Sequence, residues 1–123
     1  MDTTHKEFFE ELARNLDFWV ERITQNATDP SADLKRTSYP SAFHILQQTL
    51  TTPEQRAALR TVIFDGMSGL LHSVLVGFDG GTQLAEKFTL MITTSEGVRL
   101  RPGLHEFFVE YLDITGRMPP PEE

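Results

Sequence analysis

The chain has 123 residues, of which 39% are hydrophobic and 24% are charged. A chain of this size and composition closes one hydrophobic core but not two, so we expect one domain over residues 1–117 and an extended, proline-rich tail over residues 118–123. Eighteen Asp and Glu against eleven Lys and Arg give a net charge of −7. This acidity disfavours nucleic-acid binding, and it either favours a basic protein partner or only keeps the protein soluble.

The absence of cysteine excludes disulfide scaffolds, thiol nucleophiles and Cys-ligated zinc. The N-terminus lacks a basic region followed by an apolar run, and we expect every apolar stretch to fall short of the ~20 residues of a membrane span. A cytoplasmic, bacterial-type protein without a membrane segment is therefore expected. The Asp79-Gly80-Gly81 run lacks the Lys and hydroxyl residues of a phosphate loop, so it predicts a turn, and no motif predicts a cofactor.

The N-terminal segment predicts a first amphipathic helix, because its apolar residues recur at helical spacing as far as Ile23. Thr4 and Glu7 form a candidate capping box at its start. Phe18 falls outside the apolar stripe, which leaves three interpretations: a solitary surface residue, a residue covered by a loop, or a contact for a partner.

Residues 26–41 are rich in Thr, Ser, Asp and Pro and predict a surface loop. A short second helix is expected after Ser41, ending at Thr49 or Leu50. The next segment carries the clearest helix start in the chain, with Thr52 as the cap, Pro53 at the first helical position and Gln55 three residues after the cap.

This start predicts a long third helix that ends at Gly77 or at the turn after it. Gly66 and Gly69 lie on or beside its expected core face, where a missing side chain allows another helix to approach closely. We expect that core face to consist of Leu59, Val62, Ile63, Met67, Leu70 and Val74.

The C-terminal part of the chain predicts one helical turn over residues 82–87, a β-hairpin over residues 88–101 and a last amphipathic helix from Leu104 that Gly116 stops. The hairpin is predicted from alternating apolar and polar residues on either side of the turn at residues 94–97. The expected fold class is therefore mainly α, of the α+β type, with about four amphipathic helices and one small hairpin packed on them.

The candidate ligand-binding residues lie on the third helix, at positions i, i+4, i+7 and i+11, and therefore share one face of an otherwise apolar element: Thr61, Asp65, Ser68 and His72. An Asp and a His one or two turns apart can share a ligand, and a Ser between them can act as a nucleophile or a hydrogen-bond donor. The alternative interpretation is a solvated strip of short polar side chains. No catalytic residue is assigned.

The four histidines show no spacing that is typical of a zinc site, so no metal is expected from a motif. A site assembled from His72, Asp79 and His105 across separate elements stays open as an alternative to chance scatter of the histidines.

Two C-terminal segments, residues 72–81 and residues 104–112 followed by Thr115-Gly116-Arg117, loosely resemble small uncharacterised bacterial domains. Some bacterial proteins of that size resemble immunity proteins, which protect a cell by binding a toxin. The resemblance implies a binding role and carries over no functional residue.

Three functions from different classes remain as hypotheses. The first is a non-enzymatic protein-binding module, in one form an immunity-type antagonist of a basic partner. The second is a small ligand-binding or hydrolytic domain that uses the polar strip of the third helix. The third is a homodimer of structural or regulatory role that buries the surplus apolar surface around Phe18 and the hairpin edge. An enzyme is the less favoured class because no catalytic set appears.

Overall fold

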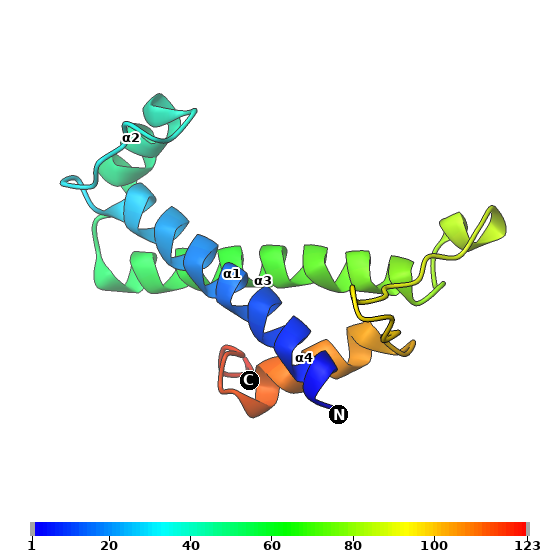
Figure 1. The fold of residues 1–123 in the computed structure, drawn as a ribbon. Helices are drawn as coiled ribbons and strands as arrows, with labels where there is room; N and C mark the ends of the chain where they lie inside the picture. Colours follow the sequence, from blue (N-terminus) through cyan, green and yellow to red (C-terminus); the bar gives the residue numbers. More distant parts are fainter. Residues whose placement is uncertain (1, 123) are drawn as a thin grey trace. The chain divides into compact units, whose positions relative to one another are not determined.

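The computed structural model describes residues 2–122, and these residues are mainly helical. The element order is α1 (Thr3–Thr28), α2 (Pro40–Thr49), α3 (Pro53–Phe78), the 3-10 helix η1 (Gln83–Glu86) and α4 (Leu104–Ile114), as Figure 1 shows. The predicted helices are therefore confirmed, including the single turn expected over residues 82–87. Helix α1 continues through Thr28, into the segment that composition had predicted as loop.

The first turn of α1 is capped by Asp2 and not by the predicted pair of Thr4 and Glu7. The Asp2 Oδ1 atom accepts a hydrogen bond from the backbone N–H of His5 at 2.9 Å. A short acidic side chain just before a helix satisfies one of the N–H groups that have no partner inside the helix, and its charge interacts favourably with the helix dipole.

The capping box of α3 is confirmed. The backbone N–H of Gln55 donates to the Thr52 hydroxyl, and the Gln55 side-chain oxygen accepts from the N–H of Thr52, both at 3.1 Å. Helix α2 starts at Pro40, two residues earlier than predicted, because Pro40 occupies its first turn and does not break it. The ring fixes a φ angle that suits a first helical residue, where the missing N–H has no partner to lose.

The predicted β-hairpin is wrong. Among residues 2–122 there is no strand, and residues 88–101 form an irregular loop with one isolated antiparallel bridge between Thr93 and Arg99. Its turn is present, since Thr94 N–H donates to Val98 C=O at 2.8 Å and Gly97 adopts a positive φ of 84°. Alternation therefore located the turn correctly. The flanking segments pair too briefly to form a sheet, and a two-stranded ribbon has little stability of its own.

The chain divides into two compact units, residues 1–14 with 68–123 and residues 15–67. The first unit has a core built around aromatic side chains from α1 and α4. The Phe9 ring lies 5.7 Å from the Phe108 ring and 6.2 Å from the Tyr111 ring, centroid to centroid. Its buried aliphatic side chains come from α3, the irregular loop and α4: Leu75, Leu100, Leu104 and Leu112.

The second unit buries few apolar side chains, namely Leu16, Val20, Ala27 and Phe64. Polar contacts join its helices. The Gln47 side chain of α2 is buried and donates to the C=O of Asn26 at 2.8 Å, and Arg60 of α3 pairs with Glu21 of α1 at 2.5 Å. A domain over residues 1–117 that folds as one unit stays a prediction.

The predicted core face of α3 is wrong for three of its members. Val62, Leu70 and Val74 are 68%, 66% and 47% exposed, whereas Phe64 and Leu75 are buried. The helix is therefore rotated relative to the predicted orientation. Since α3 is apolar on most sides, periodicity alone did not fix which side faces the core.

Candidate functional site

The polar strip predicted on α3 divides between the two units. Thr61 and Asp65 belong to the second unit and are exposed, and the Thr61 hydroxyl donates to its own helix at the C=O of Ala57 at 3.1 Å. Ser68 and His72 belong to the first unit and are half-buried. A hydroxyl bound to the preceding turn is satisfied locally. A ligand-binding role for the strip remains a prediction.

His72 takes part in a different cluster, which the sequence offered only as an alternative. In the first unit, Asp79 follows the last residue of α3, and His105 lies in the first turn of α4. The His105 ring contacts Asp79 Oδ2 through Nδ1, and the His72 ring meets the His105 ring edge to face with centroids 5.2 Å apart. The three residues named as a possible assembled site are therefore neighbours.

Asp79 caps the N-terminus of α4 through its side chain, although it lies 25 residues before Leu104, the first residue of that helix. Its Oδ1 accepts the backbone N–H of Gly103 at 2.9 Å and of Leu104 at 3.0 Å, and its Oδ2 accepts the N–H of His105 at 3.0 Å. Gly103 adopts a positive φ of 98°, a conformation that glycine reaches without strain. The N-terminal amide groups of α4 and its dipole thus converge on one carboxylate.

The charge of Asp79 is stabilised where it lies. Its side chain is only 6% exposed, and burial by itself opposes ionisation. The hydrogen bonds from the backbone and ring of His105 and from Leu104 and Gly103 outweigh that burial, so the pKa of Asp79 falls below its usual value of 3.8. An ionised carboxylate only accepts hydrogen bonds, so His105 Nδ1 carries a proton, and the other ring nitrogen, Nε2, lies 3.8 Å from Glu106 Oε1.

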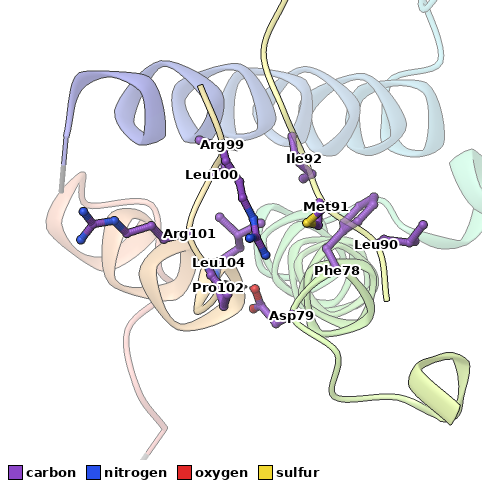
Figure 2. Close-up of a pocket in the computed structure, with 10 residues that line it drawn as sticks. All are labelled: Phe78, Asp79, Leu90, Met91, Ile92, Arg99, Leu100, Arg101, Pro102 and Leu104. Atoms are coloured by element: carbon purple, nitrogen blue, oxygen red, sulfur yellow. Dashed lines mark hydrogen bonds between the residues drawn. The ribbon is translucent and has the colours of Figure 1, made fainter. Parts of the chain in front are cut away.

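An oriented Asp and His pair of this kind can hold a catalytic base, but here the carboxylate has the bonding pattern of a helix cap. In the described part of the chain, no group of three or more His, Asp or Glu side chains is arranged to hold a metal ion. Beside the cluster, Asp79 and Arg99 line a cavity of about 20 Å³ between the end of α3 and the irregular loop (Figure 2). That volume suits one water molecule and not a substrate.

A second polar cluster in the first unit was missed by the sequence analysis. His5 is 4% exposed, and its Nδ1 lies 2.8 Å from Asp2 Oδ1. Its Nε2 accepts the backbone N–H of Arg101 at 3.2 Å. A larger cavity of about 280 Å³ is lined by Asp2, His5, Arg101 and Phe107. The Asp-x-x-His spacing at a helix start could have indicated the contact between Asp2 and His5, but nothing local indicated Arg101.

The exposed side of α3 is a further apolar feature outside the core. The span Pro53–Glu86 is long and apolar enough to cross a membrane by length and composition, and only 11% of its apolar window is buried. This differs from the expectation that no stretch approaches such a length, because Asp65 is the only charged residue between Arg60 and Asp79. A Cβ atom added at Gly66 or Gly69 would meet no atom within 4 Å, so the space beside both glycines is open.

Phe18, the predicted partner contact, is 53% exposed. Its ring meets the Trp19 ring edge to face at 5.4 Å, and the Arg22 guanidinium lies 5.7 Å from its centroid. The exposure agrees with its position outside the apolar stripe of α1. A role in contacting a partner is a prediction.

Comparison with protein-family models, with curated proteins and with solved structures gave no match. The geometry of the chain therefore carries the functional argument alone.

Proposed function

We propose that this chain is a non-enzymatic protein-binding module whose binding surface is the exposed face of α3. That face is defined by Gly69, Leu70 and Val74, which all lie in the first unit. The observation that carries the proposal is the small buried share, 11%, of the apolar window of α3. Monomeric proteins rarely expose large contiguous apolar surface, and where they do it often marks an interaction site.

The chemistry of this face suits a helix or an apolar groove of another protein. Leu70 is 66% exposed, and the open space beside Gly69 allows a close approach of backbone to backbone. A membrane is a less suitable environment for α3, because Asp65 and His72 would each have to enter the hydrocarbon region.

The charge of the chain bears on the kind of partner. With a net charge of −7, it attracts a basic protein over long range, and apolar contact with α3 would supply the short-range recognition. An immunity-type antagonist of a basic toxin is one form of this function, in line with the resemblance of the C-terminal segments. Association with such a partner should slow steeply between about 0.01 and 1 M salt, over which the Debye length falls from about 30 to 3 Å.

The hydrolytic alternative receives less support. The Thr61 hydroxyl is bound to its own helix, and the Asp79 carboxylate caps α4. A homodimer through the α3 face is the remaining alternative, and the same variants distinguish it.

The test compares two exposed apolar residues of nearly equal accessibility. Leu70 is 66% exposed on the α3 face, and Ile45 is 65% exposed on α2. A partner is first captured from the native host and identified by mass spectrometry, and its affinity for L70R, I45R and the wild type is then measured. We expect L70R to weaken binding at least about tenfold and I45R to leave it nearly unchanged. Equal affinity of the wild type and L70R would overturn the proposal.

Two further measurements separate the alternatives. Sedimentation velocity of the isolated chain over a range of concentrations detects a homodimer, which L70R should dissociate if α3 forms the contact. Co-sedimentation with lipid vesicles detects insertion of α3 into a bilayer. A homodimer or an insertion into vesicles would replace the proposed function if no other protein is found whose binding L70R weakens.

A further inference from the structure

A buried histidine at the N-terminus of α1 joins two parts of the first unit that are far apart in the sequence. His5 lies 96 residues before Arg101, whose backbone N–H donates to its Nε2. Around it, the ring centroids of Phe9 and Phe107 lie 6.2 and 6.3 Å away. His5 therefore connects the first turn of α1 to the end of the loop that precedes α4.

The hydrogen bonds fix the protonation state of this ring. Because Arg101 donates a backbone proton, His5 Nε2 must offer its lone pair. The proton of the neutral ring then resides on Nδ1 and is donated to Asp2 Oδ1, 2.8 Å away. Both ring nitrogens are thus used, and each has one role that the neutral tautomer can fill.

Protonation of the ring keeps one of these contacts and removes the other. An imidazolium donates from both nitrogens, so Nε2 would present a proton to the N–H of Arg101. Two donors that face each other cannot share a hydrogen bond, and in this partly buried position the Arg101 amide would lose its partner. The contact with Asp2 would become an ion pair and would hold the ring in place.

The two charged groups that face His5 have opposite effects on the stability of a positively charged ring. Asp2, just before α1, stabilises the imidazolium, whereas the Arg101 side chain lines the same cavity of about 280 Å³ and adds positive charge there. Helix α4 contributes Phe107, and α1 contributes Phe9, both uncharged.

We propose that His5 is a pH-sensitive latch, which holds residues 99–102 against the first turn of α1 while its ring is neutral and releases them when the ring is protonated. Imidazole is the side chain whose ordinary change of charge lies between about pH 5 and 8, which is why a histidine is suited to such a latch. Release is local, because Gly103 and Leu104 are bound independently by Asp79. It keeps the hydrogen bond from the Leu100 N–H to the Ile92 C=O at 2.9 Å, and it widens the cavity beside Phe107.

Nuclear magnetic resonance on the full chain tests the latch. The ¹⁵N shifts of the His5 ring report its tautomer, and hydrogen exchange, corrected for its intrinsic dependence on pH, reports the protection of the Arg101 amide. We expect the Nδ1–H tautomer at pH 8, and a loss of about tenfold in Arg101 protection that follows the protonation of His5. Constant Arg101 protection while His5 becomes protonated would overturn the proposal.

Variants separate the latch from general acid sensitivity. H5Q supplies an amide oxygen that can accept the Arg101 N–H but does not titrate, so its Arg101 protection should not change between pH 8 and 5. A pH-dependent loss in H5Q equal to that of the wild type would refute the latch. H44Q, which removes a histidine of α2, should behave as the wild type does. If H5Q does not fold, the D2N variant provides the test. The loss of Arg101 protection should then occur at lower pH, because the imidazolium loses its counter-charge. An unchanged midpoint of this loss would refute the latch.

Discussion

The substitution Asp79→Ala should destabilise the chain more than its position in a turn would indicate. It removes the acceptors of three backbone N–H groups and of the His105 ring. Loss of an N-cap acceptor costs about 0.5–2 kcal/mol, and a hydrogen bond to a charged group contributes about 1.5–3 kcal/mol. Because these bonds share one carboxylate they are not additive, and we expect the free energy of unfolding to fall by about 2–4 kcal/mol.

The loss of stability in Asp79→Ala should depend on pH, because the Asp79 carboxylate is titratable. The folded state lowers the pKa of Asp79 below its usual 3.8 because hydrogen bonds from His105, Leu104 and Gly103 outweigh the opposing effect of burial. The stabilisation is therefore complete above the unfolded-state pKa and is lost as the pH falls through the lower folded-state pKa. The difference between the wild type and Asp79→Ala should shrink only below about pH 4.

Urea unfolding at pH 7, followed by far-ultraviolet circular dichroism, measures this difference. Asp79→Asn keeps one acceptor oxygen for Gly103 and Leu104 and should recover part of the loss. Asp113→Ala removes an exposed carboxylate from the last turn of α4 and should change stability by less than about 0.5 kcal/mol. If Asp79→Ala unfolds within the same 0.5 kcal/mol of the wild type, Asp79 does not cap α4 as described.

Three further predictions concern the core, the domain organisation and the polar strip. Leu75 is 2% exposed, so Leu75→Ala should lower the free energy of unfolding in urea by about 2–5 kcal/mol, whereas Leu70→Ala should lower it by under about 1 kcal/mol. The reverse order would show that a different side of α3 faces the core. If residues 1–117 fold as one domain, fluorescence of Trp19, the only tryptophan, should change at the same urea concentration as circular dichroism, and separated transitions would indicate two domains. Alanine at Asp65 or at His72 should lower the melting temperature by an amount equivalent to less than about 1 kcal/mol, with no effect of a chelator, and a chelator-sensitive wild type would revive a ligand site on α3.

Helices were predictable because their signals are local. The capping box of Thr52 and Gln55 lies within four residues, and the Gly116 stop, with a positive φ of 72°, depends on one residue. The orientation of α3 and the pairing of residues 88–101 were not predictable in this way. Both depend on which distant surface packs against the segment, and an apolar helix or an alternating loop fits more than one such surface.

The candidate sites were likewise predictable only where they depend on local spacing. Shared spacing identified Thr61, Asp65, Ser68 and His72 as one face of a helix, which is a statement about α3 alone. The contacts of Asp79 with His105 and of His5 with Arg101 join residues 26 and 96 positions apart. The sequence indicated the contact between Asp79 and His105 only through the alternative that His72, Asp79 and His105 form an assembled site. It gave no indication of the contact between His5 and Arg101.

The position of Asp79 has a consequence for how the chain tolerates changes in length. By binding Gly103, Leu104 and His105, one carboxylate fixes both ends of the connection between α3 and α4 at a single point. The entropy of closing a flexible loop grows only with the logarithm of its length, and a doubling costs about 0.6 kcal/mol. Insertions within residues 88–98 should therefore leave the start of α4 in place. This connection is therefore a part of the first unit in which changes of length should be tolerated while the start of α4 is kept.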